Sequence, residues 1–144
     1  MRRRRHLLSH LTNDTRGTSA IEFAILAPIF FMVVFSMIGY GIYLSASHAV
    51  QQITADAART AVAGLDAAER RRLAEDYVKT STNEYAFLDE RAFAVAVQDD
   101  PSNPAQFTVS ISYDATDLPI WQLYSFAMPD KVIRRFATIR VGGI

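Results

Sequence analysis

Cysteine is absent from the 144-residue chain, which excludes a disulfide framework, a thiolate metal site and a cysteine nucleophile. Histidine is scarce, and the spacing of His6, His10 and His48 would not gather three metal ligands. No glycine-rich phosphate loop follows a predicted strand, and the carboxylates are scattered rather than paired. We therefore predict that the protein is not an enzyme and has no catalytic residue, no bound metal and no cofactor.

The formal net charge is zero, but the charges are unevenly distributed. Residues 1–17 carry five Arg against one Asp, a net charge of +4, and the rest of the chain is therefore at −4. An anionic body argues against direct nucleic-acid binding, because phosphate recognition needs a basic face. The basic N-terminal cluster must have another role.

A long uncharged segment follows that cluster. Residues 23–44 are 22 positions without a charged side chain, and Glu22 and His48 flank them. At 1.5 Å per residue this helix would be about 33 Å long, close to the roughly 30 Å hydrocarbon core of a bilayer. The remaining residues are too few to bury such a helix on every side. The segment is therefore predicted to span a membrane once.

The basic residues predict the orientation of this span. Residues 2–5 and Arg16 are arginines on its N-terminal flank, which favours a cytoplasmic N-terminus and a C-terminal domain on the opposite side from about Ser45. The apolar run is longer than the 7–15 residues typical of a secretory signal peptide. Residues 45–47 would still serve as a weak signal-peptidase site, so a cleaved, secreted domain stays open as an alternative.

Gly17 is followed five residues later by Glu22, at the cytoplasmic edge of the apolar segment. Together with the Arg-rich leader and the Glu22-Phe23 pair, this pattern resembles a type IV prepilin processing site and, more specifically, the TadE-like minor pilins. The resemblance is specific over roughly residues 16–63. It implies that a prepilin peptidase cuts between Gly17 and Thr18, and that Glu22 then pairs with the freed ammonium on Thr18 of a neighbouring subunit.

Two of these residues also have a physical interpretation without the family. Gly17 has no Cβ, so it can be drawn extended into a protease and breaks helix continuity between leader and span. Glu22 could equally be a first-turn carboxylate that the helix dipole favours and that reaches the headgroups. Both interpretations of Glu22 stay open.

The resemblance implies a minor pilin or pseudopilin that takes part in assembling a tight-adherence, type IV-like pilus or a related secretion apparatus. Its partners would be the inner membrane, the prepilin peptidase, major and minor pilins and the pilus assembly platform. The C-terminal domain would be periplasmic, with incorporation into an extracellular pilus. The alternative is an uncleaved signal-anchor protein whose extracytoplasmic domain binds or regulates an envelope complex.

Further features of the helix predict how it bends and packs. Pro28 predicts a bend inside the span. Small residues at four-residue spacing form a candidate surface for packing against other pilin helices, although such residues are also common in membrane helices generally; they are Gly41, Ser45 and Ala49. An alanine-rich continuation predicts helix as far as Gly64. Its apolar stripe would meet a partner helix or the C-terminal sheet; it comprises Ala46, Ala49, Val50, Ile53, Ala57 and Ala61.

The C-terminal part begins with helix signals. Gly64 is a natural helix stop, and residues 66–69 have the pattern of a capping box that opens a second helix to about Asn83. Residues 70–72 are three arginines, which we interpret as a solvated face with acidic partners four residues on, such as Arg72 with Asp76.

Alternation of large apolar residues with Ala, Thr or Ser then predicts strands near residues 93–97 and 107–113, with a turn at residues 99–104. A last strand at about residues 132–141 would complete the sheet. Residues 118–129 are aromatic and predict a loop with a short helical turn, which caps the core, dips into the outer headgroup layer or meets another subunit. The predicted fold is α+β: a transmembrane helix extending into a stalk, a second short helix and a small antiparallel three-stranded sheet. The predicted divisions are a basic leader (1–17), the transmembrane and stalk helix (18–64) and a small extracytoplasmic α+β domain (65–144).

Overall fold

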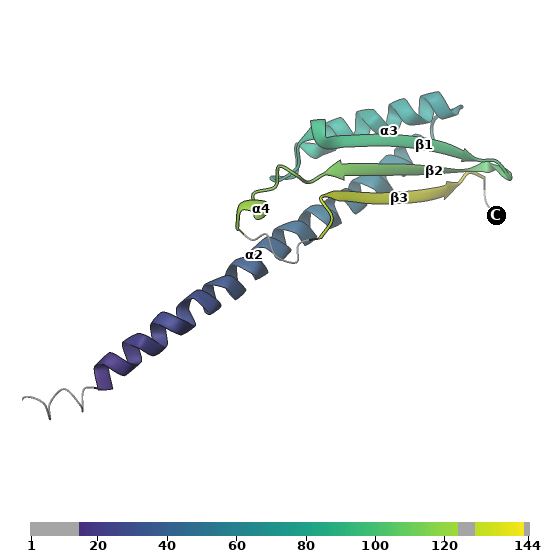
Figure 1. Cartoon of the computed structure of the whole chain (residues 1–144). Coiled ribbons are helices and arrows are strands. Elements are labelled where there is room, and N and C mark those ends of the chain that lie inside the picture. The colour runs from purple at the N-terminus through teal and green to yellow at the C-terminus, as the bar shows by residue number, and fades with distance from the viewer. Residues whose placement is uncertain (1–14, 124–128, 143–144) are drawn as a thin grey trace, which may run out of the picture. The chain divides into compact units, whose positions relative to one another are not determined.

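The computed structural model describes residues 15–123 and 129–142 (Figure 1). Most of the predicted leader and residues 124–128 of the aromatic segment lie outside this description. The chain divides into two compact units, Met1–Ile38 and Gly39–Ile144. We call the second of these the C-terminal unit. The α+β fold class is confirmed, with one long apolar helix, a second short helix and a three-stranded antiparallel sheet.

The long helix is α2, Thr15–Ala61, and it continues through Pro28 without interruption. It ends three residues before the predicted end at Gly64. The amide groups of Val62, Ala63 and Gly64 each donate to the carbonyl three residues earlier, at 3.0–3.3 Å. The final turn therefore tightens out of α-helical geometry before the chain leaves the helix.

The predicted stripe on the last part of α2 is buried within the C-terminal unit. Ile53 is 1% exposed, and Val50, Ala57 and Ala61 are fully buried. These residues share one core with Ala74 and Val78 of the second helix and with apolar residues of the sheet. The buried Thr54 hydroxyl donates to the Val50 carbonyl oxygen at 2.6 Å, so this polar group costs little in the core. The partners of the stripe are this chain's own helix and sheet.

The second helix is α3, Ala67–Thr82, with Asn83 as its C-cap. Asp66 Oδ1 accepts the Glu69 amide at 2.8 Å, and Glu69 Oε2 accepts the Leu65 amide at 2.8 Å. The reciprocal capping predicted from residues 66–69 is therefore present, although Glu69 reaches one residue further back than a standard capping box does.

The ion pair on α3 differs from the predicted one. The pair of Arg72 with Asp76 does not form, and Arg71 Nε instead lies 2.8 Å from Glu75 Oε1. Both pairs have four-residue spacing, but Glu has one more methylene than Asp with which to span the turn.

Arg70 does not lie on the solvated face that we predicted for residues 70–72. Its side chain is 13% exposed, and Nη1 lies 2.7 Å from Asp99 Oδ1. Its Nε donates to the Gly64 carbonyl oxygen at 3.2 Å, and its guanidinium lies 4.8 Å from the centre of the Phe107 ring. Arg70 therefore ties the connection between α2 and α3 to the sheet, with a charge-assisted hydrogen bond and a cation–π contact.

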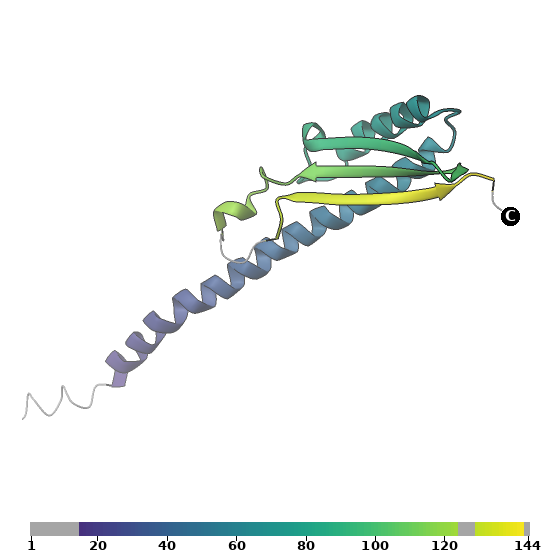
Figure 2. The ribbon, with the colours of Figure 1, turned by 45° about the vertical axis from the view of Figure 1, so that its right-hand side comes forward.

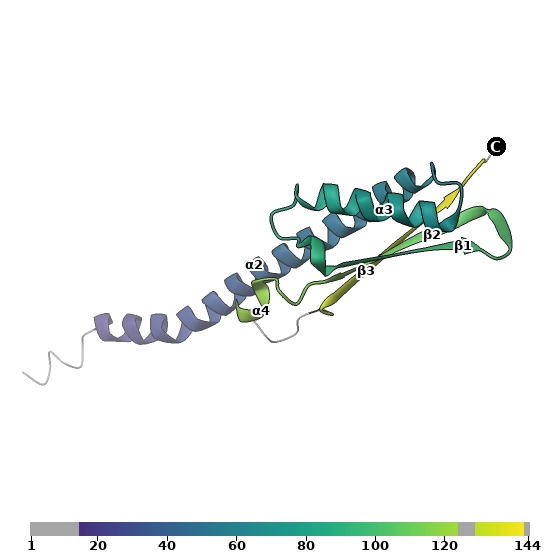
Figure 3. The same ribbon diagram turned by 90° about the horizontal axis from the view of Figure 1, so that it is seen from above.

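The sheet contains β1 (Phe93–Asp100), β2 (Asn103–Asp114) and β3 (Val132–Arg140), and the short helix η1 (Glu90–Ala92) precedes it. The strands are antiparallel and lie in the order β1-β2-β3, as Figure 2 shows. Paired residues in an antiparallel sheet point to the same face. The inner face of β2 is buried, and Figure 3 shows α3 on one side of the sheet. All three predicted strands are confirmed.

The turn between β1 and β2 is shorter than predicted, because Asp100 pairs with Asn103 and only Pro101 and Ser102 lie outside the strands. Asp100 Oδ1 accepts the Ser102 amide at 2.8 Å and the Ser102 hydroxyl at 2.6 Å. These hydrogen bonds, the side-chain one first, lower the pKa of the Asp100 carboxyl below its ordinary value. The register of the pairing with β1 shifts between Asp99 and Asp100, which allows Pro104 to stand in a central strand.

The segment between β2 and β3 contains the short helix α4, Ile120–Leu123. Leu118 is 4% exposed and Ile120 is fully buried, and both belong to the core. Trp121 Nε1 donates to the Ala115 carbonyl oxygen at 2.6 Å. The predicted short helical turn is confirmed, and Leu118 and Ile120 cap the core.

Gly64 is buried, and glycine is needed there for a reason other than a left-handed helix cap. Among the glycines of the described residues, only Gly142 has a positive φ. A Cβ on Gly64 would lie 2.7 Å from the Arg70 backbone nitrogen and 2.8 Å from Arg70 Cγ. The close approach of the first turn of α3 therefore requires glycine here.

We expect Gly64→Ala to lower the free energy of unfolding of the C-terminal unit by about 1–3 kcal/mol, because backbone atoms must shift to make room. The measurement is thermal unfolding of the full chain in detergent. Gly41→Ala is the matched control, since a Cβ there meets nothing within 4 Å and alanine favours a helix. Equal unfolding temperatures for the two variants would contradict the prediction.

Candidate functional site in the N-terminal helix

The predicted processing residues lie in the first turns of α2. The helix starts at Thr15, so Gly17 is helical and does not interrupt it. Thr18 and Glu22 are both exposed. Because they are four residues apart, their side chains lie on the same helix face, one turn from each other.

The part of α2 that follows Thr18 presents an apolar surface. Apart from the half-buried Val34, the large apolar side chains from Ile21 to Ile38 are between 42% exposed at Phe35 and 71% exposed at Phe23. A soluble monomer rarely leaves so continuous an apolar surface uncovered. In the part of the chain that the structure describes, Thr18–Ala61 is the one helix long and apolar enough to cross a membrane. These features are those of a single-pass membrane protein.

One face of this helix carries clustered aromatic rings. The centroids of Phe30 and Phe31 are 5.7 Å apart, edge to face, and those of Phe31 and Phe35 are 6.1 Å apart, stacked. A shallow hollow of about 400 Å³ is lined by Phe23, Leu26, Ala27, Phe30 and Phe31. The Ser36 hydroxyl donates to the Met32 carbonyl oxygen at 2.6 Å. The face is therefore suited to lipid chains or to another apolar helix.

The predicted small-residue surface is only partly exposed. Gly41 and Ser45 are exposed, whereas Ala49 is 7% exposed inside the C-terminal unit. Gly39, two residues before Gly41, is also buried, and a Cβ there would lie 3.9 Å from Ile120 Cβ. Of the three residues, Gly41 and Ser45 are thus the ones that a helix of another subunit could reach.

The sequence did not predict two contacts that fasten β3 and its preceding loop to α2. The Tyr43 hydroxyl donates to the Asp130 carbonyl oxygen at 3.2 Å, and Arg135 donates to the Ser47 hydroxyl. The sequence does contain a signal for the contact between Arg135 and Ser47. Arg135 occupies an inward position of β3, between the inward residues Ile133 and Ala137. A charged residue at such a site needs a polar partner.

The described residues, 15–123 and 129–142, contain no group of three or more His, Asp or Glu side chains placed to hold a metal ion. Within the same ranges, no buried side-chain nitrogen or oxygen lacks a hydrogen-bond partner.

A family model described as TadE-like protein matches residues 17–59. This segment is TadE-like. The match confirms the resemblance inferred from Gly17, Glu22 and the apolar run. No curated protein and no solved structure matches the chain. The TadE-like segment starts at Gly17 and ends two residues before α2 does, so it contains neither α3 nor the sheet. The match over this segment suggests a link to tight-adherence pilus systems.

Proposed function

We propose that the chain is a minor pilin or pseudopilin of a tight-adherence pilus or a related secretion apparatus. The TadE-like match that starts at Gly17 carries the proposal. The exposed apolar helix from Ile21 to Ile38 supports it, because such a helix needs either lipid or other helices around it. The protein's role is then structural rather than enzymatic. It is anchored in the bacterial inner membrane with the N-terminus cytoplasmic and the C-terminal unit periplasmic.

Processing in this proposal is hydrolysis of the peptide bond between Gly17 and Thr18. Water adds across that bond, the leader leaves with a carboxylate on Gly17, and Thr18 keeps a new ammonium group. Because Gly17 lies within α2, the first turn must unwind for a peptidase to bind it. Glycine lowers the cost of that unwinding by about 1 kcal/mol relative to alanine.

After cleavage, the Glu22 carboxylate can pair with the new ammonium group on Thr18 of a neighbouring subunit. Both its carboxylate and the Thr18 ammonium lie next to apolar side chains, where an unpaired charge is costly. Pairing Glu22 with Thr18 of a neighbouring subunit offsets both costs and sets the stagger between two helices. The exposure of Thr18 and Glu22 on one face of α2 supports such a contact.

The test is the N-terminus of the full chain extracted from membranes, with and without a co-expressed prepilin peptidase. Intact mass and N-terminal sequencing should give Thr18 as the first residue only when the peptidase is present. Gly17→Leu should keep Met1 in both samples, because a bulky side chain prevents the close approach of the peptidase to the backbone that glycine allows. Gly41→Leu in the same helix is the matched control and should be processed normally.

The other outcomes identify the alternatives. Intact Met1 in both samples would overturn the proposal in favour of an uncleaved signal anchor whose outer domain binds an envelope complex. The helical backbone at residues 15–17 is the observation that favours that alternative. A first residue near His48 would instead indicate ordinary secretion.

A further inference from the structure

One face of the sheet is covered by no described element of the chain. Figure 3 shows α3 on the opposite side. The register places Ser112 opposite Arg134 and Ser110 opposite Phe136 on this outer face. Phe136 is 71% exposed, and Arg134 and Arg140 are also exposed. We call Arg134, Phe136 and Arg140, with the small residues beside them, the Phe136 face.

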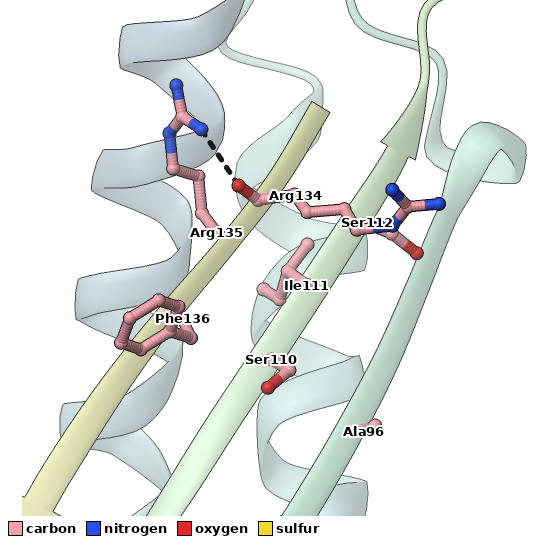
Figure 4. Close-up of a pocket in the computed structure, with 7 residues that line it drawn as sticks. All are labelled: Ala96, Ser110, Ile111, Ser112, Arg134, Arg135 and Phe136. Atoms are coloured by element: carbon pink, nitrogen blue, oxygen red, sulfur yellow. Dashed lines mark hydrogen bonds between the residues drawn. The ribbon is translucent and has the colours of Figure 1, made fainter. Parts of the chain in front are cut away.

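The Phe136 face contains a hollow. Its volume is about 330 Å³, and its outer-face lining consists of Ala96, Ser110, Ser112, Arg134 and Phe136. Figure 4 shows Arg134 extending across Ser112 towards β1, whereas Arg135 points towards α2. An aromatic wall opposite small Ala and Ser side chains leaves room for one more apolar side chain against Phe136.

The Phe136 face is basic. Between residues 94–98, 106–112 and 134–140, the outward positions include Arg134 and Arg140 but no carboxylate. Carboxylates lie at the two ends of this region, where Asp114 is the next outward residue of β2 and Asp100 accepts a hydrogen bond from Gln106. Neither arginine is in an ion pair with another residue that the structure describes. A partner that places negative charge beside Arg134 and Arg140, and an apolar side chain against Phe136, would complement the middle of this face.

A second surface of the same unit has the complementary chemistry. Residues 83–90, which we call the acidic loop, carry exposed Glu84, Asp89 and Glu90 and a Phe87 that is 51% exposed. None of these carboxylates is in an ion pair within the described ranges. A wide hollow of about 700 Å³ beside the loop is lined by Thr82, Asn83, Leu88, Asp89, Glu90 and Arg91.

The backbone of the acidic loop is held in place. The Tyr113 hydroxyl donates to the Phe87 carbonyl oxygen at 3.2 Å, and Asp89 Oδ1 accepts the Arg91 amide at 2.9 Å. A loop fixed in this way loses little conformational entropy on binding. Phe87 is therefore presented as a rigid anchor with carboxylates around it.

We propose that the Phe136 face binds the acidic loop of a second copy of this chain. Phe87 of one copy enters the hollow beside Phe136 of the other, and Arg134 and Arg140 face Glu84, Asp89 and Glu90. Because the two surfaces differ, the contact is heterologous, and each copy keeps one surface free for the next. This inference adds a contact between C-terminal units to the proposed function, but it does not depend on cleavage after Gly17.

The absence of cysteine makes the contact testable by disulfide cross-linking of the full chain in membranes. Two differently tagged copies are co-expressed, one with Ala86→Cys and one with Ser110→Cys, and oxidised with copper phenanthroline. A disulfide needs Cα atoms within about 7 Å of each other. In the control, Thr80→Cys, at an exposed site on α3, replaces Ala86→Cys in the first copy. The yield of mixed dimer with Ala86→Cys should be at least about fivefold higher than in this control.

Charge reversal provides the second arm. Arg134→Glu in the Ser110→Cys copy should lower the mixed dimer at least about fivefold, and Glu90→Arg in the Ala86→Cys copy should restore it. Restoration also shows that the Arg134→Glu copy is folded. A mixed dimer no more abundant than the Thr80→Cys control would overturn the proposal. Dimers between two Ser110→Cys copies would also overturn it, because they would show two sheets face to face. N-terminal sequencing of the same samples reports on processing separately.

Discussion

Phe107→Ala should lower the free energy of unfolding of the C-terminal unit by about 3–5 kcal/mol, which is typical of truncating a buried aromatic. Phe107 is fully buried on the central strand β2. The variant also loses the contact with the Arg70 guanidinium, 4.8 Å from the ring centre. Arg70 would then keep its carboxylate partner, Asp99, but would lie over an empty space.

The measurement is the unfolding temperature of the full chain in detergent, with protease resistance of the C-terminal unit as a second readout. At about 4–8 °C per kcal/mol for a domain of 60–100 residues, the shift should exceed 10 °C. Phe136→Ala is the matched control, because it removes the same side chain from the same sheet at a 71% exposed position. Its effect should stay within about 0.5 kcal/mol. Similar shifts for the two variants would contradict the assigned faces of the sheet.

Glu22→Ala should have the second large effect, on assembly rather than folding. If the Glu22 carboxylate and the Thr18 ammonium pair between subunits, removing one partner leaves the other buried and unpaired, which costs about 3–5 kcal/mol. Incorporation into fibres with a co-expressed major pilin should therefore fall by about 100-fold or more. The amount of the chain in sheared fibres, relative to that left in membranes, measures the effect.

Glu75→Ala is the control for Glu22→Ala, since its side chain is 39% exposed and its ion pair with Arg71 lies on the surface of α3, where such pairs contribute little. The N-terminus of both variants should be checked, so that a defect in cleavage is not mistaken for a defect in pairing. Unchanged incorporation of processed Glu22→Ala would show that Glu22 is only an interfacial first-turn carboxylate.

The sequence predicted the elements whose signals are local. The apolar run predicted the long helix, Asp66 and Glu69 predicted the start of α3, and alternation predicted β1 and β2. Each of these signals comes from neighbouring residues that act within one element. The predicted position of Asn83 as the end of α3 was correct for the same reason.

Features that depend on contacts between distant residues were not predicted. Arg70 looked like its neighbours Arg71 and Arg72, and only the packing of α3 on the sheet brings it to Asp99 and Phe107. The reason for Gly64 likewise lies in Arg70, six residues away. Turn residues 99–104 predicted a long connection, but pairing of Asp100 with Asn103 shortened it.

The sequence of β3 contains a sign of the Phe136 face that the alternation of residues alone did not identify as a contact surface. In β3, Ile133 and Ile139 share the inward parity, whereas Phe136 has the opposite parity, together with Arg134 and Arg140. A large aromatic residue out of phase with its strand indicates either an unusual core or a contact surface. The structure places it on the uncovered face.

The strand order has a consequence for how the protein is made. β2 is the central strand, but its neighbour β3 comes 17 residues later, near the end of the chain. At about 5–20 residues per second, β2 is synthesised about one to three seconds before β3. Throughout that interval one edge of β2 has no strand to pair with, and Ile133 has not yet joined the core. Until β3 has been made and has paired with β2, the nascent chain exposes an unpaired strand edge, and during this interval it is prone to aggregate and would benefit from a chaperone.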